Sequence, residues 1–362
     1  MAKQKIADQI DLLSAPANAK AKPARNGKAT AQSMATQQRE ISVSEFFSRN
    51  RHLLGFDNPR RALLTGVKEA VDNSLDACEE AGILPEIEVA LEQLADDRYL
   101  MRVVDNGPGI VKGQIPNIFG KLLYGSKFHR LRMSRGQQGI GISAASMYGQ
   151  LTTGKAPRVI SRTGPKRPAH YYEIQIDTAH NKPQVIREEQ IEWDHGKGTQ
   201  VEIEMEARYQ RGKQSVDEYV RQTAVANPHL TLCYTPPDGK AVVYERSTKE
   251  LPPEAQEIKP HPYGVELGML MKMLQATPHR TLQGFMTTEF SRVSVRVAKE
   301  ICEKADLKPN GRPKSIAREE SDRLFKAINA TKLMRPPTDC IVPIGEELLL
   351  QSLQQNVTAE FY

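Results

Sequence analysis

Asp105 stands at the end of the apolar segment LMRVVD and is followed closely by Gly107 and Gly109. A carboxylate at the end of a strand can accept a hydrogen bond from an exocyclic amine, such as that of adenine. The two glycines allow the backbone to turn tightly and to approach a ligand. By itself, however, the segment DNGPG is more typical of an ordinary turn than of a binding site.

A second glycine cluster, GQQGIG, contains Gly136, Gly139 and Gly141 and precedes a helix predicted over residues 142–148. Backbone N–H groups at the start of a helix form a site suited to phosphate. No GK[ST] sequence follows, so the cluster does not match the Walker pattern of phosphate-binding loops. Taken alone, it is equally consistent with a flexible loop.

A stripe of polar side chains lies in the segment KEAVDNSLDACEEAG and consists of Glu69, Asp72, Asn73 and Asp76. At 100° per residue these four side chains fall within about 100° of a helix surface, opposite Leu64, Val67, Val71, Leu75 and Cys78. One face can therefore pack and the other stays polar. The polar face alone is more typical of solvated helix surface than of a site, so its meaning depends on the two glycine segments.

These segments need a scaffold, and the hydrophobic pattern predicts one of class α+β. A long helix is expected to begin at an Asn58 cap with Pro59 in its first turn and to end at Gly82. Further helices are expected after Ser42, which forms a capping-box spacing with Glu45, and near 115–123 and 215–226. Strands are expected near 87–94, 100–104, 159–162, 171–177, 185–192 and 199–205. No parallel βαβ unit is evident, so we predict helices layered on an antiparallel sheet.

Composition divides the 362-residue chain into four parts. We predict a flexible basic tail at residues 1–40 and the layered domain at residues 41–236. A small helical domain is predicted at residues 263–337, and the start of another domain at residues 338–362. Net charge is +6, and residues 292–335 hold twelve Lys or Arg against six Asp or Glu, which indicates a polyanionic partner for that part. The four cysteines have no metal-binding spacing and are expected to be free thiols. No signal peptide or membrane span is predicted, and a cytoplasmic protein is expected.

The combination of Glu69-x-x-x-Asn73, Asp105-x-Gly107-x-Gly109 and GQQGIG resembles the three motifs of the GHKL ATPases, which share the Bergerat fold. That superfamily includes gyrase-type topoisomerases, MutL, a class of heat-shock chaperones and histidine kinases. The segments KEAVDNSLDA, FGKLLYGSKF and RGQQGIGISAASMYGQLTTGKA are similar to one branch, the ATPase (B) subunits of type IIB DNA topoisomerases.

The resemblance implies a role for each matching residue. Glu69 would activate the attacking water, and Asn73 would be both a nucleotide contact and the ligand of Mg²⁺. Asp105 would recognise the adenine amino group, supported by Thr199. The remaining implied contacts to ATP are Gly107, Gly109, Gln138, Gly139, Ile140 and Gly141, together with Ser126 and Lys127 in a lid over residues 120–138. Asp72 and Asp76 could instead hold the helix to neighbouring loops, and the sequence leaves that open.

The later part of the chain also fits this branch. Residues 263–337 resemble its helix–two-turns–helix domain, which gyrase and MutL lack. Lys308, Arg312 and Lys314 flank a Pro-Asn-Gly turn and are candidates for contacts to the DNA backbone, although a merely charged surface is an equally good interpretation. Residues 338–362 resemble the beginning of the branch's transducer domain. Most of that domain is missing from the sequence, so we expect this chain to bind ATP better than it hydrolyses it.

The resemblance implies an ATP-operated clamp. Two B subunits would dimerise on ATP binding, with a strap at residues 41–47 crossing between them, and close over double-stranded DNA. An A subunit would cut the DNA, in an A2B2 heterotetramer that relaxes supercoils and decatenates DNA. The alternatives are a DNA-binding scaffold with a vestigial nucleotide site and a different GHKL ATPase such as a mismatch-repair protein; a histidine kinase is disfavoured because no acceptor domain is evident.

Overall fold

The computed structural model describes residues 35, 40–125, 131–135 and 140–357. By its internal contacts the chain divides into Met1–Ile41 and Ser42–Tyr362, and every element named here belongs to the second unit. The predicted basic tail lies almost entirely outside the described residues. Four predicted nucleotide contacts do as well: Ser126, Lys127, Gln138 and Gly139.

An eight-stranded sheet forms the centre of the first part of this unit, with the strand order β5-β4-β3-β6-β2-β1-β7-β8. Its strands are β1 (Glu86–Ala95), β2 (Arg98–Asp105), β3 (Arg158–Arg162), β4 (Ala169–Asp177), β5 (Lys182–Ile191), β6 (Gly198–Glu206), β7 (Thr231–Thr235) and β8 (Val242–Tyr244). The six predicted strands are present.

The predicted antiparallel sheet is wrong in one respect, because β1 and β7 pair in parallel and the sheet is mixed. A parallel pair needs a crossover connection. Here the chain between β1 and β7 ends with a helix, which returns the chain to the end of the sheet where β1 begins. The five-residue strand TLCYT is too short for its sequence to predict which strand it pairs with, or in which direction.

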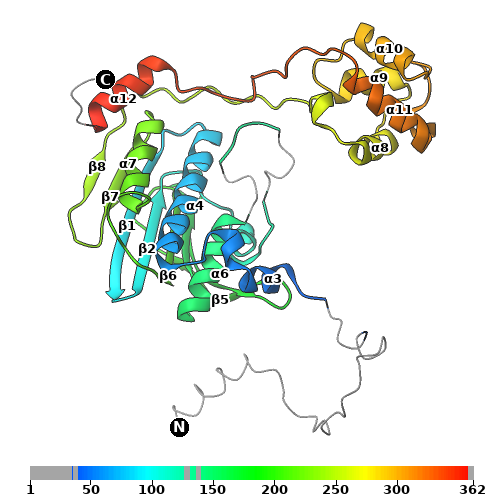
Figure 1. Cartoon of the computed structure of the whole chain (residues 1–362). Coiled ribbons are helices and arrows are strands. Elements are labelled where there is room, and N and C mark those ends of the chain that lie inside the picture. The colour runs from blue at the N-terminus through cyan, green and yellow to red at the C-terminus, as the bar shows by residue number, and fades with distance from the viewer. Residues whose placement is uncertain (1–34, 36–39, 126–130, 136–139, 358–362) are drawn as a thin grey trace. The chain divides into compact units, whose positions relative to one another are not determined.

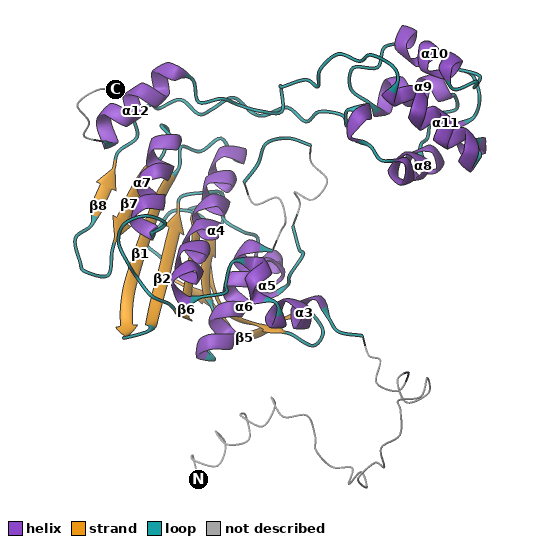
Figure 2. Cartoon of the chain, in the orientation of Figure 1, coloured by secondary structure: helices purple, strands orange, loops and turns teal. Residues whose placement is uncertain are grey.

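Helices lie against one face of this sheet, as Figures 1 and 2 show for α4 (Pro59–Glu80), α6 (Gly141–Thr153) and α7 (Val216–Ala226). Two shorter helices, α3 (Val43–Arg49) and α5 (Ile115–Gly120), complete the layer. The predicted caps of α4 are confirmed, since the Asn58 side chain accepts a hydrogen bond from the N–H of Arg61, and Gly82 follows the helix at φ +66°. The predicted cap at Ser42 is also confirmed, because its hydroxyl accepts a hydrogen bond from the N–H of Glu45.

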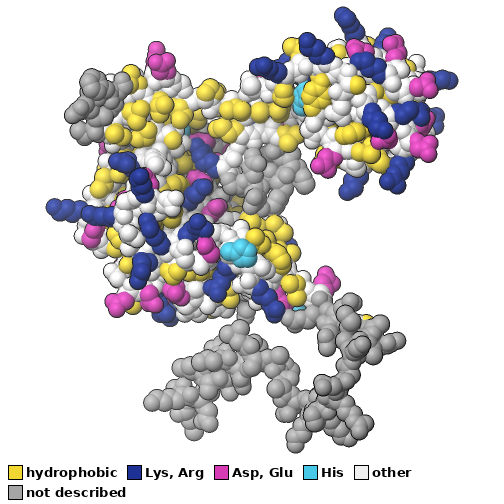
Figure 3. Space-filling model, viewed as in Figure 1, with side chains coloured by type: hydrophobic (Ala, Val, Ile, Leu, Met, Phe, Trp, Pro, Cys, Tyr) yellow, Lys and Arg dark blue, Asp and Glu magenta, His cyan; other side chains and the backbone are white. Residues whose placement is uncertain are grey.

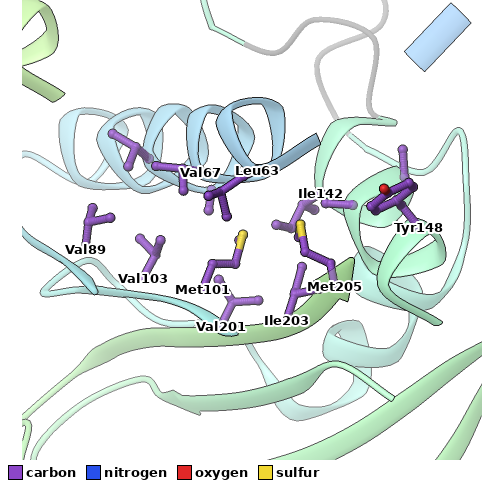
Figure 4. Packing of buried hydrophobic residues seen from close by; sticks show 14 of the residues in the cluster. Leu63, Val67, Val89, Met101, Val103, Ile142, Tyr148, Val201, Ile203 and Met205 are labelled. Atoms are coloured by element: carbon purple, nitrogen blue, oxygen red, sulfur yellow. The ribbon is translucent and has the colours of Figure 1, made fainter. Parts of the chain in front are cut away.

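The core lies between the helices and the sheet. Leu63 and Val67 of α4 face Met101 and Val103 of β2, and Ile203 of β6 lies beside them (Figure 4). Each fully buried aliphatic side chain of this kind stabilises the fold by about 1.5–3 kcal/mol. This packing holds α4 flat on the sheet, so that its opposite, polar face is kept in a fixed position.

A second hydrophobic cluster belongs to four helices of the later part of the chain: α8 (Leu267–Ala276), α9 (Leu282–Glu289), α10 (Val295–Lys304) and α11 (Arg318–Asn329). The sequence did not predict helix α9, because LQGFMTTE contains glycine and two threonines, which are weak helix formers. The side chain of Thr281 caps it, and Phe285 is fully buried. The identification of these helices as a helix–two-turns–helix domain stays a prediction.

In the described part of the segment after α11, a further helix, α12 (Glu346–Asn356), packs against α7. Ser352 Oγ donates a hydrogen bond to the Ala224 carbonyl of α7 at 3.3 Å. The four cysteines are free thiols, as predicted. Among the described residues, no helix combines the length and the hydropathy needed to cross a bilayer.

Candidate functional site

The polar face of α4 carries Glu69 and Asn73, both half-buried. Burial raises the pKa of Glu69, the charge of Asp72 raises it further, and Lys68 opposes these effects. A raised pKa gives a carboxylate more affinity for a proton, which suits a group that must take one from water. Helix α4 therefore presents a potential base and an amide one turn apart.

The role of Asp72 and Asp76, which the sequence left open, is visible in their hydrogen bonds. The Tyr219 hydroxyl of α7 donates to Asp72 Oδ1 at 3.0 Å, and Arg135 Nη1 donates to Asp76 Oδ1 at 3.0 Å. Both carboxylates thus connect α4 to neighbouring segments.

Asp105, the last residue of β2, is 7% exposed and lies opposite Thr199 of β6 in the sheet. Its Oδ1 accepts hydrogen bonds from the backbone N–H groups of Gly107 at 2.9 Å and Thr199 at 3.1 Å. Its Oδ2 accepts one from the Ser74 hydroxyl of α4 at 3.0 Å. Burial raises the pKa of this carboxyl, and the three hydrogen bonds oppose the rise.

The turn after Asp105 requires glycine at position 109. Gly109 has φ +71°, and a Cβ atom there would lie 2.2 Å from the carbonyl oxygen of Arg162. The loop therefore lies directly against the end of β3. Its position is fixed further because the Ile110 N–H donates to Ser161 Oγ at 2.7 Å, and Ser161 Oγ lies 3.1 Å from the Thr199 hydroxyl.

The start of α6 faces the same part of α4. A Cβ atom on Gly141 would lie 1.7 Å from Glu69 Oε2, so the carboxylate occupies the space that any larger residue would need. Ile140, the N-cap of this 13-residue helix, provides no side-chain capping hydrogen bond. Among the described residues, no side chain therefore caps the first N–H groups of α6, and free N–H groups suit phosphate oxygens.

The arrangement fits a magnesium–nucleotide complex by its donor set. A carboxylate and an amide stand beside an uncapped helix start, and a buried carboxylate suited to an amine lies at the end of β2. Mg²⁺ keeps several waters and phosphate oxygens in its coordination shell, so one amide oxygen from Asn73 is a sufficient protein ligand. Among the described residues, no group of three or more His, Cys, Asp or Glu side chains is placed to hold a metal ion.

Helix α4 unites the predicted motifs. Ser74, the residue after Asn73, bonds to Asp105, while Glu69 lies against Gly141, so two segments far apart in sequence meet on this helix. Among the predicted residues with described positions, this region includes Glu69, Asn73, Asp105, Gly107, Gly109, Ile140, Gly141 and Thr199. Lys308, Arg312 and Lys314 belong to the helical part of the chain and are exposed there.

Sequence reasoning missed Ser74, Ser161 and Arg135. The helical wheel places Ser74 at 140° from Glu69, on the side turned toward the sheet, and that position was a usable signal. Ser161 lies within an unremarkable strand, and nothing local marks it.

Arg135 forms the centre of a charged network. Its guanidinium donates to Asp76, to Glu79 at 2.9 and 3.1 Å, and to Asn227 at 2.6 Å, while His229 Nε2 lies 2.8 Å from the Glu79 carboxylate. Burial alone would raise the pKa of Glu79, but the hydrogen bonds from His229 and Arg135 outweigh it and lower that pKa overall. The network attaches residues 131–135, within the predicted lid, to α4.

Comparison with known proteins agrees with this geometry. Residues 58–209 match the family described as histidine kinase-, DNA gyrase B-, and HSP90-like ATPase. This part of the chain is accordingly a GHKL-type ATPase domain, and the predicted Bergerat fold is confirmed. The match covers α4, the turn after β2 and the start of α6.

Matches over most of the chain define its family more narrowly than the ATPase domain does. The chain is 51% identical over 91% of its length to the B subunit of type 2 DNA topoisomerase 6 from Methanococcoides burtonii, and 48% identical over 91% to that from Archaeoglobus fulgidus. It belongs to the family of topoisomerase VI B subunits, as the motifs predicted. The chain spans about half the length of these curated relatives, 53% and 54% respectively.

Proposed function

We propose that this chain is the ATP-binding and ATP-hydrolysing part of a type IIB DNA topoisomerase subunit. The observation that carries the proposal is the position of α4, which contacts the buried carboxylate of Asp105 through Ser74 and the start of α6 through Glu69. The names of the relatives at about half sequence identity support the same function.

The residues divide the work between binding and chemistry. Asp105 accepts a hydrogen bond from the adenine amine, with Thr199 supporting the base, while Gly107 and Gly109 shape the pocket. The backbone at the start of α6 holds the phosphates, together with Gln138 and Gly139 and, from the predicted lid, Ser126 and Lys127. Glu69 orients the attacking water and accepts its proton. Asn73 contributes one ligand to Mg²⁺, which when bound neutralises charge on the phosphates.

The larger assembly is inferred from the family. The chain would pair with an A subunit in an A2B2 heterotetramer, dimerise through the ATPase domain when ATP binds, and close around double-stranded DNA. Helix α3 carries the predicted strap; within this chain the Ser44 hydroxyl donates to the Thr178 carbonyl at 2.8 Å. Strap exchange between subunits would have to replace that bond by an equivalent one in the partner. We propose that this assembly relaxes supercoiled DNA and decatenates DNA in the cytoplasm, at the nucleoid.

The helical part of the chain is the proposed DNA contact. Lys308 and Gly311 close a turn through a 2.8 Å backbone hydrogen bond, and the carbonyls of Pro309 and Gly311 accept from the first N–H groups of α9. The exposed cations Lys308, Arg312 and Lys314 are therefore held on an ordered turn. Figure 3 shows many Lys and Arg side chains over this helical part, interspersed with Asp and Glu. Contacts of this kind bind phosphates without selecting sequence.

Glu69→Ala tests the proposal. We expect the variant chain to bind ATP with Mg²⁺ about as well as the unaltered chain, while a full-length subunit carrying the change, assembled with its A subunit, loses at least about a hundredfold in turnover. Glu92→Ala, an exposed carboxylate on β1, is the matched control and should retain turnover. Normal turnover by Glu69→Ala would remove that residue as the base, and failure of the unaltered chain to bind ATP would favour a vestigial nucleotide site.

A further inference from the structure

The hydrogen bonds on Asp105 leave one acceptor position open. Each carboxylate oxygen has two lone-pair sites. Gly107 and Thr199 occupy both sites of Oδ1 through their N–H groups, and the Ser74 hydroxyl occupies one site of Oδ2. No hydrogen bond from a described residue uses the second site of Oδ2, so that site can accept a donor from a ligand.

We propose that Ser74 is a specificity-determining positioning residue, whose hydroxyl fixes Asp105 so that the last acceptor site of Oδ2 selects a nucleobase with an exocyclic amine. This inference rests on the proposed nucleotide site and deepens it, since it assigns the choice of base to a residue of α4 that does not itself touch the ligand.

The three donors restrain the carboxylate because they come from different elements. Gly107 belongs to the turn after β2, Thr199 to β6 and Ser74 to α4. The two N–H bonds hold only Oδ1, so without the Ser74 hydroxyl Oδ2 would have two open sites and the carboxyl plane could rotate. Ser74 is well suited to prevent this, as it is 6% exposed and lies in the C-terminal half of a 22-residue helix packed on the sheet.

A buried acceptor with one open site discriminates strongly between bases. An amine at purine position 6 donates a hydrogen bond to Oδ2, whereas a carbonyl oxygen there presents lone pairs to a carboxylate and is repelled. A site built to pair with a donor also rejects an analogue that merely lacks it, because the buried acceptor is then left without a partner. Purine riboside triphosphate, which has hydrogen at position 6, isolates this last effect.

The experiment measures dissociation constants of ATP, purine riboside triphosphate and inosine triphosphate with Mg²⁺ for the whole chain and for Ser74→Ala. The unaltered chain should bind ATP most tightly. In Ser74→Ala, ATP affinity should fall about tenfold, as expected for loss of a hydrogen bond to a charged group, while affinity for purine riboside triphosphate changes less than about twofold. Ser146→Ala is the control, a buried serine of α6 whose hydroxyl lacks a hydrogen-bond partner among the described residues, and should change neither value.

Three outcomes would overturn the inference: equal weakening of ATP and purine riboside triphosphate, no change in Ser74→Ala, or an unaltered chain that binds the two nucleotides equally. The last needs no variant, so the inference stays testable if Ser74→Ala does not fold. Ser74→Cys, nearly the same size but a weaker donor, should show an intermediate preference for ATP. An unaltered chain that binds none of the three nucleotides would instead refute the proposed function.

Discussion

Replacing Arg135 by methionine should destabilise the folded chain substantially, because methionine keeps the apolar stem of the side chain and removes only the charge and its donors. The bonds that disappear include four from the guanidinium to described residues: one to Asp76, two to Glu79 and one to Asn227. The two carboxylates remain in place, with side chains only 7% and 22% exposed.

The magnitude follows from that residual charge. Removing one partner of a buried ion pair costs about 3–5 kcal/mol. The side chain of Arg135 is 25% exposed and His229 still pairs with Glu79, so the lower end applies, about 3 kcal/mol. By comparison, Arg61→Met removes an exposed i,i+4 pair with Asp57 and should cost only about 0.3–0.5 kcal/mol.

Urea unfolding of the three proteins at pH 7 provides the assay, with the midpoint expected to fall for Arg135→Met at an unchanged m-value. The pH dependence gives a second check. Because the pKa of Glu79 is lowered in the folded state, its contribution is present above the unfolded pKa and is lost as pH falls through the folded value. The difference between Arg135→Met and the unaltered chain should therefore shrink in acid. Equal losses for the Arg135 and Arg61 variants, or a difference that grows in acid, would refute this reasoning.

Three further predictions concern the site, the helical part and the sheet layer. Gly141→Ala should reduce ATP turnover of the full-length subunit at least about tenfold, since the new Cβ would lie 1.7 Å from Glu69 Oε2 and displace it; turnover at the normal rate would contradict the observed packing. Replacing Lys308, Arg312 and Lys314 by glutamine should weaken binding to any DNA sequence. The slope of log affinity against log salt concentration should fall by about 1 for each of these residues that contacts a phosphate, as measured by titration at several salt concentrations. An unchanged slope would argue against contact by these three residues. Ser215→Ala removes the side-chain cap of α7 and should cost about 1 kcal/mol in thermal or urea unfolding, whereas no measurable loss would mean that packing alone fixes the helix start.

Several features of the site could be predicted because they depend on neighbours in sequence. The caps of α4 at Asn58 and Gly82 are local, and so is the separation of its polar and apolar faces, which follows from a fixed 100° step. The glycines at 107, 109 and 141 were recognisable by type. Their physical reasons, a positive φ at Gly109 and the Glu69 carboxylate beside Gly141, appear only in the structure.

The sequence by itself determined which helix face is polar, where that helix starts and ends, and which glycine turns accompany it, since these properties depend on residues a few positions apart. Only the tertiary structure decided which partner each polar group found. Asp72 bonds to Tyr219, Asp76 to Arg135, Asp105 to Ser74, and β1 pairs in parallel with β7. Such pairs are separated by tens to more than a hundred residues, and nothing local specifies them; they form because packing α4 on the sheet brings buried polar groups within reach, where each one must find a donor or acceptor.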